Sequence, residues 1–160
     1  DDSQIPDESY FKEVKRVSQN QIVFGGNYFI QHLDNTPCFI IWDKDNSGNF
    51  ADAELAWTSF KTATRIFKYR WNGMLQQDMK NKEERIHPTH KPIALYSWIF
   101  KNYAEQGMKI LDTHGGSMSS VISADKAGLE MVCCELDKEY FDKAVERFKR
   151  YKSQEVMQFK

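Results

Sequence analysis

The final third of the chain alternates regularly between short apolar strands and amphipathic helices. Residues 109–112 are predicted to form a strand, 119–127 a helix that stops at Gly128, 129–136 a second strand and 138–152 a second helix. This element order is typical of a parallel sheet covered by helices, because neighbouring parallel strands need a crossover connection. The sequence therefore predicts an α/β fold.

The earlier part of the chain carries further elements of the same kinds. Apolar residues at helical spacing predict a helix over 7–17, and a Pro in the first turn predicts another over 92–104. Short runs rich in apolar, aromatic and β-branched residues predict strands over 21–24, 38–42, 53–60 and 64–71. The run 38–42 is apolar on both faces, which favours a central strand covered on both sides.

The chain has 160 residues, which is enough for one domain with a core but too few for two comfortable domains. We therefore expect a single domain over residues 1–160. Residues 72–86 differ from their surroundings because charged and amide side chains dominate them. Such a run is most often a solvated connection, and the alternative is a loop that faces a polar partner.

Bulk composition excludes some classes of protein. The 22 basic and 23 acidic residues give a net charge of -1, which argues against binding nucleic acid by overall charge but allows a local basic face. No apolar run approaches the roughly 20 residues needed to span a bilayer. The three cysteines form no Cys-x-x-Cys pair, so we expect buried free thiols in a reducing compartment. The four histidines lack metal-ligand spacing, so we expect no metal site.

A turn of small residues follows the strand over 109–112. Between Asp112 and the next helix, Gly115 and Gly116 would let the backbone approach a ligand while helix N–H groups point outward. The following strand ends at Glu135, about 20 residues later, where nucleotide-binding α/β units place a carboxylate for ribose hydroxyls. Turn and acid together favour a nucleotide-like ligand. The alternatives are a tight structural turn and a solvent-exposed acid that caps the next helix.

A third motif makes the pattern specific. The segment His87-Pro88-Thr89-His90-Lys91-Pro92 directly precedes the helix over 92–104. It resembles the His-Pro-Thr-Gln-Lys-Pro motif of β-group DNA amino-methyltransferases, which include phage and bacterial adenine-specific enzymes. In that family a helix, a strand ending in Asp, a Gly-Ser-Gly turn and a strand ending in Glu follow. The same order occurs here at 112–119 and at Glu135, and stretches 21–28, 41–44 and 54–58 are also similar to the family.

The resemblance implies a Rossmann-like methyltransferase fold, with a mostly parallel sheet and helices on both faces. It implies S-adenosyl-L-methionine as cofactor, with Asp112 and the turn at its methionine part and Glu135 at the ribose. Asp137 or the residues following it would lie near the adenine. Lys91 would pair with the cofactor's carboxylate. The implied cofactor-binding residues are Thr89, Lys91, Pro92, Asp112, Thr113, His114, Gly116, Ser117, Glu135 and Asp137.

The chain departs from the family in two places. The family's catalytic motif, Asp/Asn/Ser-Pro-Pro followed by Tyr or Phe, binds the target amine and stacks on a flipped base. No Pro-Pro pair occurs in these 160 residues. We therefore assign no catalytic residue and expect that the chain begins after the motif, as an N-terminally truncated domain. Met118 stands where the family has the last glycine of its turn, and would strain the turn or enter the pocket if that position needs positive φ.

We therefore expect a DNA methyltransferase that uses S-adenosylmethionine to modify the N6 amine of adenine, present here as the cofactor-binding part without the catalytic loop. Expected partners are duplex DNA with a flipped base, faced by the loop over 72–86, and a second copy of the chain; no membrane or metal is expected. The expected setting is restriction-modification in the cytoplasm of a bacterial or phage-infected cell. The alternatives are methylation of cytosine N4, or a degenerate chain that binds DNA or a partner without catalysis.

Overall fold

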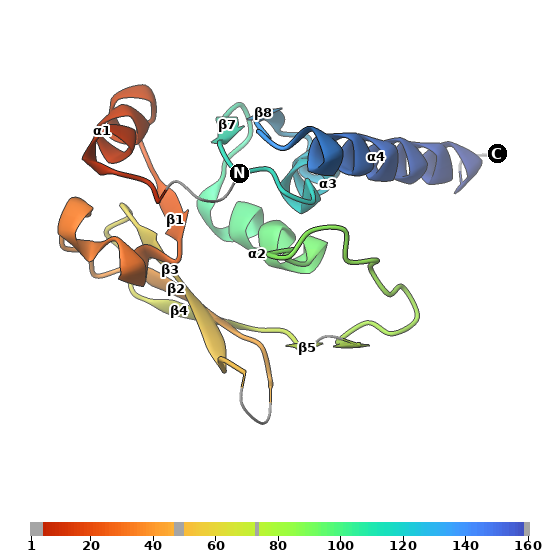
Figure 1. The fold of residues 1–160 in the computed structure, drawn as a ribbon, viewed down its shortest axis with the longest axis horizontal. Helices are drawn as coiled ribbons and strands as arrows, with labels where there is room; N and C mark the ends of the chain where they lie inside the picture. Colours follow the sequence, from red (N-terminus) through yellow and green to blue (C-terminus); the bar gives the residue numbers. More distant parts are fainter. Residues whose placement is uncertain (1–4, 47–49, 73, 159–160) are drawn as a thin grey trace. The chain divides into compact units, whose positions relative to one another are not determined.

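The computed structural model describes residues 5–46, 50–72 and 74–158, and the chain divides into two compact units between Lys82 and Glu83. Figure 1 shows the elements of each unit along the chain. Within the described residues, no helix is both long enough and apolar enough to cross a membrane. The expectation of a single domain over residues 1–160 stays a prediction.

The first unit holds one helix, a four-stranded sheet and a small strand pair. Its elements are α1 (Glu8–Val17), β1 (Ile22–Phe24), two single turns of 3-10 helix (η1, Gly26–Tyr28, and η2, Ile30–His32), β2 (Phe39–Asp43), β3 (Ala53–Thr58), β4 (Arg65–Lys68), β5 (Trp71–Asn72) and β6 (Leu75–Gln76). The helix and the four strands expected from the sequence are confirmed, with β3 and β4 shorter than expected. Asp7 begins α1, because its Oδ1 accepts the backbone N–H groups of Ser9 (2.9 Å) and Tyr10 (3.1 Å).

The expectation of a mostly parallel sheet is wrong for the described strands. The larger sheet has the order β1-β3-β2-β4, in which β3 runs antiparallel to both of its neighbours and β4 runs parallel to β2. The strands β5 and β6 are also antiparallel. The cause lies in the connections: a short link such as 44–52 can only reverse the chain, whereas a parallel neighbour needs a longer crossover.

Buried residues of the first unit lie on both faces of this sheet, because Ala56 and Trp57 of β3 point to opposite faces and are both buried. Ile40 and Trp42 of β2 are fully buried while their neighbours along the strand are half-buried, so β2 alternates rather than being covered equally on both faces. Thr58 of β3 is also buried, and its hydroxyl donates to the carbonyl of Cys38 at 2.7 Å. This bond satisfies a polar group that burial would otherwise make costly.

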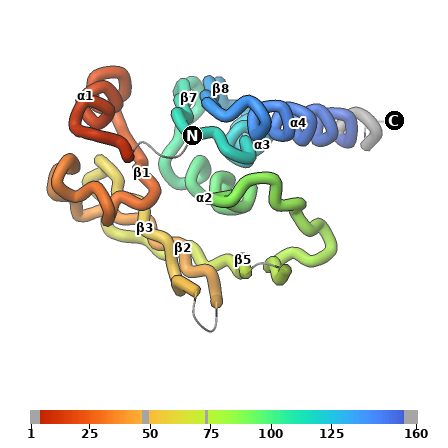
Figure 2. Tube along the Cα trace, viewed as in Figure 1, coloured from red at the N-terminus to blue at the C-terminus, as the bar shows by residue number. Residues whose placement is uncertain are grey.

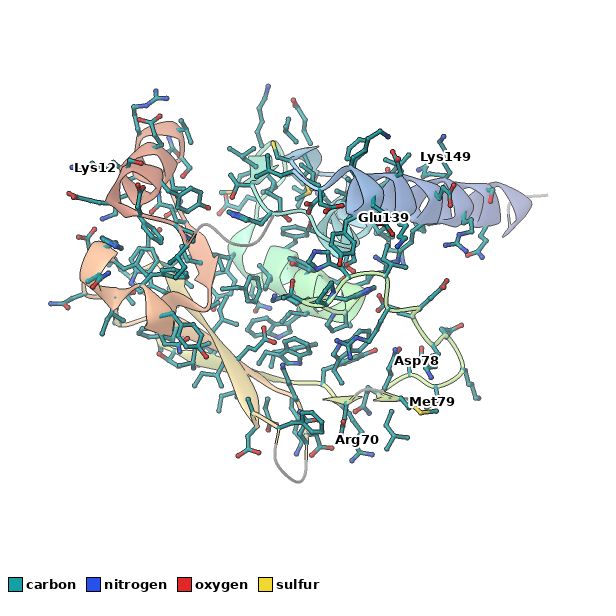
Figure 3. All side chains as sticks on the ribbon, viewed as in Figure 1. Lys12, Arg70, Asp78, Met79, Glu139 and Lys149 are labelled. Carbon is teal, nitrogen blue, oxygen red and sulfur yellow. The ribbon has the colours of Figure 1, made fainter. Side chains whose placement is uncertain are left out.

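The polar stretch 72–86 contains more order than a simple connection. It includes β6 and Asn72, the last residue of its partner strand β5, and Gln76 is buried. Beyond β6, the carboxylate Oδ1 of Asp78 accepts the backbone N–H groups of Lys80 and Asn81, each at 3.1 Å. Figure 3 labels Asp78 and Met79 in this stretch, where both side chains are exposed. Whether the stretch faces DNA stays a prediction.

The second unit has the strand–helix alternation expected from the sequence. Its elements are α2 (Ile93–Tyr103), β7 (Lys109–Asp112), α3 (Ser119–Ala127), β8 (Glu130–Cys133) and α4 (Lys138–Gln158), which follow one another from green to blue in Figure 2. Strands β7 and β8 are parallel, with Ile110 opposite Met131 and Asp112 opposite Cys133. Gly128 ends α3 in the left-handed conformation (φ 68°), as its position after the last helical residue predicts.

Helices do not cover both faces of this strand pair. Ile110 and Met131 are half-buried, but Leu111 and Val132, which point to the opposite face, are 48% and 59% exposed. In a sheet the side chains alternate between the two faces, so these exposures separate a covered face from an uncovered one. The expectation of helices on both faces is therefore not met within the second unit.

Candidate functional site

The candidate site lies in the second unit, at the carboxyl ends of the parallel strands β7 and β8. Asp112 ends β7, and its carboxylate accepts two hydrogen bonds, from the backbone N–H of His114 (3.0 Å) and from the hydroxyl of Ser120 (2.6 Å). The second bond reaches into the first turn of α3. In open α/β sheets this edge is where ligands bind. Asp112 therefore fixes the start of the turn relative to the helix that follows it.

Two glycines bring the turn close to the end of β8. The backbone N–H of Gly115 donates to the carbonyl of Cys134 at 2.7 Å, and a Cβ at Gly115 would lie 2.5 Å from Sγ of Cys133. No side chain fits there without displacing its neighbours. Gly116 has φ of +52°, a conformation that favours glycine. The close approach of turn and strand thus depends on both residues.

Glu135 connects the turn to the start of α4. Its Oε2 accepts the backbone N–H of Gly116 at 2.7 Å, and its Oε1 accepts the backbone N–H of Asp137 at 2.9 Å. A carboxylate held by two backbone donors has a fixed orientation and keeps acceptor capacity for a ligand. The structure therefore brings together Asp112, Gly116 and Glu135, three of the residues expected from the sequence.

Asp137 is at the start of α4, and its expected place near the adenine stays a prediction. Its Oδ1 accepts the backbone N–H groups of Glu139 (2.9 Å) and Tyr140 (3.0 Å), so Asp137 is the residue that caps α4. The hydrogen bond from Tyr140 is the main cause that lowers the pKa of Asp137 below its ordinary value. The alternative considered for Glu135, an acid that caps the next helix, describes Asp137 instead.

The segment 87–92 contributes one residue directly to the turn. The ring of His87 lies against Gly116, where a Cβ would meet Nδ1 at 3.4 Å, and packs edge-on against Tyr140 with ring centroids 4.4 Å apart. Thr89 donates its backbone N–H to Nδ1 of His87 at 3.2 Å, and Nζ of Lys91 lies 3.5 Å from the carbonyl of Thr89. His87 was not among the expected site residues, although it begins the recognised motif.

The remaining expected residues differ in exposure. Ser117 and Pro92 are buried, whereas His114 is exposed and Thr113 is half-buried. The hydroxyl of Thr113 lies 2.9 Å from Nδ1 of His114. Pro92 is the residue before the first turn of α2 and offers no side-chain cap. Contact of these residues with a cofactor stays a prediction.

Met118 has the positive φ that the family's glycine at this position suggested. Its φ of 54° and ψ of 31° lie in the left-handed region, and the side chain is 6% exposed. A residue with a Cβ in this region carries strain of about 1–3 kcal/mol. The turn therefore keeps a glycine-like backbone at Met118, with the side chain buried.

Comparison with known proteins shows the family to which the chain belongs. Residues 34–146 match the N6/N4 methylase family model, described as DNA methylase. The chain belongs to this family. The match spans most of both units, so the family resemblance drawn from the sequence is confirmed at the level of N6/N4 DNA methylases. No curated protein matched the sequence.

Solved DNA methylases share the fold. The crystal structure of the M1.HpyAVI–SAM complex is 20% identical, with a TM-score of 0.63, and the match covers 91% of this chain and 84% of that one. A protein of Thermus thermophilus, assigned as a DNA modification methylase and complexed with S-adenosyl-L-methionine, is 16% identical with a TM-score of 0.60, covering 90% and 75%. At these identities the likeness concerns the fold, which is a methyltransferase-like α/β fold with mixed sheets.

Behind the turn, this methylase chain has a buried polar cluster that sequence reasoning missed. Nη2 of Arg147, on α4, lies 2.6 Å from Oε2 of Glu83, and Nη1 donates to the carbonyl of Ser117 (2.8 Å) and the hydroxyl of Ser119 (2.9 Å). Burial lowers the pKa of Arg147 from its ordinary value, while the charge of Glu83 opposes that shift. A signal was present: Arg147 comes three residues after Ala144, on the packed side of α4.

His90 belongs to the same cluster. Its Nδ1 accepts the backbone N–H of Ile86 at 3.3 Å, which leaves the hydrogen on Nε2, 3.4 Å from both Glu83 and Ser119. The side chain is fully buried, and burial is the main cause that lowers the pKa of His90 below its ordinary value. The histidine that replaces the family's glutamine therefore has a structural place behind the turn.

The cysteines divide between the two units and differ in exposure. Cys38 is buried, Cys133 is half-buried and Cys134 is exposed, so the expectation of buried thiols is wrong for Cys134. All three are free. Burial, with the neighbouring charge of Asp112, raises the pKa of Cys133 to about 12. In the described parts of the chain, no group of three or more His, Cys, Asp or Glu side chains could hold a metal ion.

Proposed function

We propose that this chain binds S-adenosyl-L-methionine at the turn between β7 and α3, as the cofactor-binding part of a DNA methyltransferase. The observation that carries the proposal is the Asp112–Gly116–Glu135 arrangement, in which acids from two adjacent parallel strand ends flank a glycine turn. This is where α/β nucleotide-binding units hold a ligand with ribose hydroxyls. The crystallised methylases that share the fold were solved with this cofactor.

The donor set fits the chemistry of this cofactor. The carboxylate of Glu135 is fixed by two backbone N–H groups and has lone pairs left to accept ribose hydroxyls. Asp112 places a second carboxylate near the turn, suited to an ammonium group, and Lys91 offers a cation for a carboxylate. The cofactor supplies an electrophilic methyl group. The residues of this unit bind and orient it, which is the main contribution that proximity makes to such a transfer.

We propose adenine N6 in duplex DNA as the target of the complete enzyme, with cytosine N4 as the alternative in the same class. The order of the three motifs, 87–92, 112–118 and Glu135, supports this assignment through its resemblance to adenine-specific members of the family. Reaching an exocyclic amine in a duplex requires a flipped base. The loop over 72–86, with its exposed polar residues, is the segment we propose to face the DNA.

A second function is favoured by one observation. The chain contains no Pro-Pro pair, so the family's base-binding motif has no counterpart in these 160 residues. A non-catalytic role, in which the chain binds DNA or a protein partner, follows if no other chain supplies that motif. A cofactor-binding part of a methyltransferase should bind S-adenosylmethionine. A degenerate, non-catalytic chain would have lost this binding.

Calorimetric titration with S-adenosylhomocysteine tests the proposal. We expect one site per chain, and we expect Glu135→Ala to weaken binding while Glu139→Ala, which changes an exposed acid in the first turn of α4, leaves it unchanged. Figure 3 labels Glu139 on α4. A folded wild-type chain that releases no heat and shows no thermal shift with this ligand would overturn the proposal and favour a degenerate, non-catalytic chain.

A further inference from the structure

Arg147 holds the two residues on either side of Met118. One nitrogen, Nη1, donates to the backbone carbonyl of Ser117 at 2.8 Å and to the hydroxyl of Ser119 at 2.9 Å. Met118 lies between them with φ of 54°, and its own backbone N–H donates to the carbonyl of Gly115 at 2.7 Å. The strained residue is thus fixed through both of its neighbours by one guanidinium group.

The guanidinium is itself held in place by a buried ion pair. Nη2 of Arg147 lies 2.6 Å from Oε2 of Glu83, and the two side chains are 11% and 15% exposed. The other carboxylate oxygen of Glu83 accepts the backbone N–H of Ile93 at 3.0 Å, at the start of α2. Each charge in this pair is compensated, and the pair is anchored on two helices. Breaking such a pair leaves an unpaired buried charge, which is strongly unfavourable.

We propose that Arg147 is a positioning residue that keeps the turn in its glycine-like conformation despite the side chain at Met118. A left-handed residue with a Cβ persists where its surroundings over-determine it. The planar fork of arginine suits this task, because its donors reach several acceptors at once. The role in cofactor binding rests on the proposed function of the turn, whereas the role in holding Met118 does not.

This positioning reaches the candidate site through the backbone of the turn. Gly116, whose N–H binds Glu135, is next to Ser117, whose carbonyl binds Arg147. If the guanidinium is removed, Met118 can relax to negative φ, and the peptide groups before it must rotate. The N–H of Gly116 would then move away from Glu135. A glycine at position 118 has no such strain to relax, so its turn does not need the guanidinium.

A double-mutant cycle between Arg147→Met and Met118→Gly tests this coupling. In thermal unfolding without ligand, we expect Arg147→Met to lower Tm by about 5 °C or more in the Met118→Gly background and by less in the wild-type background, because relaxation of Met118 recovers its strain once the guanidinium is gone. The matched control is Lys152→Met, which removes the ion pair of α4 with Asp125 (2.8 Å) away from the turn. Its effect should be equal in both backgrounds. Equal losses for Arg147→Met in both backgrounds would overturn the proposal.

Binding of S-adenosylhomocysteine provides the second readout. We expect Arg147→Met to raise the dissociation constant about tenfold, and the added Met118→Gly change to recover most of that loss. An unchanged dissociation constant in Arg147→Met overturns the positioning role at the cofactor site. If the wild-type chain does not bind the ligand, the proposed function fails, but the unfolding cycle still decides whether Arg147 holds Met118. Should Arg147→Met fail to fold, Arg147→Lys is compared in both backgrounds by the same criteria, because one ammonium cannot reproduce the fork.

Discussion

The carboxylate of Glu135 accepts the backbone N–H of Gly116 at 2.7 Å, which joins the acid after β8 to the turn after β7. The bond crosses between two segments that are 19 residues apart in sequence. It orients the acid before any ligand arrives, and preorganisation of this kind reduces the cost of binding. The other carboxylate oxygen of Glu135 accepts the N–H of Asp137, and the side chain of Asp137 in turn caps α4. Neighbouring acids thus have separate tasks.

We therefore expect Glu135→Ala to change mainly the affinity for the cofactor, and Asp137→Ala to change mainly the stability of the fold. Loss of a charged hydrogen-bonding partner costs about 1.5–3 kcal/mol, so Glu135→Ala should weaken binding of S-adenosylhomocysteine roughly ten- to a hundredfold. Asp137→Ala removes a helix cap and should lower Tm with a smaller effect on affinity. Calorimetry and thermal unfolding on the same samples measure both quantities. A larger loss of affinity for Asp137→Ala would contradict the assignment of the ribose to Glu135.

Met118→Gly should lower the stability of the second unit. It relieves strain of about 1–3 kcal/mol. It also removes a side chain that is 6% exposed, and truncation of a buried Met typically costs about 2–5 kcal/mol, so the loss is the larger effect. Because the backbone already has the left-handed conformation, affinity for S-adenosylhomocysteine should stay within about threefold. A much tighter complex would mean that the Met118 side chain occupies space that the cofactor needs.

The chain as given should transfer no methyl group to DNA. Without a Pro-Pro motif, a flipped base has neither its amine acceptor nor its stacking partner. The measurement is transfer of a tritiated methyl group from S-adenosylmethionine to unmethylated DNA, compared with a blank without protein. A thermal shift with S-adenosylhomocysteine on the same preparation serves as the control for a folded site. Transfer above the blank would show that another part of this chain binds the target base.

Stability should fall as the pH drops below about 6.5, partly because of His90. Burial lowers the pKa of His90 in the folded chain below its ordinary value of 6.5, so the unfolded chain binds this proton more readily. The stability contributed by neutral His90 is present above the unfolded value and is lost as the pH falls through the folded one. Protonated His90 would also point a donor at the N–H of Ile86.

His90→Gln separates this contribution from other groups that titrate in the same range. Glutamine, the residue of the family motif, cannot take up the proton, so its variant should lose less stability between about pH 7.5 and about pH 5.5 than the wild type does. His114→Gln, which changes an exposed histidine in the same unit, should keep the wild-type decline because it retains His90. Parallel denaturant titrations at each pH measure the free energy of unfolding. An unchanged decline in His90→Gln would rule out His90 as its source.

Local patterns in the sequence predicted most elements because they depend on neighbouring residues. The helix over 119–127 and its stop at Gly128 agree with α3, and the strand over 109–112 agrees with β7. The second strand was predicted over 129–136 but is observed over Glu130–Cys133; beyond it, the N–H of Cys134 binds the carbonyl of Asp112 at the end of β7, and its carbonyl accepts the N–H of Gly115 in the turn. Strand direction was predicted less well. Pairing in the first unit follows from which strands meet in space, and periodicity within one strand contains no such information.

The sequence by itself determined the motif order, the turn with its two glycines, the acid at Glu135 and the conflict at Met118, since each is a property of residue type and spacing. Only the tertiary structure decided which acid faces the turn and which caps α4, because that depends on where β8 ends. The tertiary structure also pairs Arg147 with Glu83, which is 64 residues away in the sequence, in one ion pair next to the turn. A buried charge needs a partner wherever the fold provides one, and no local pattern names that partner.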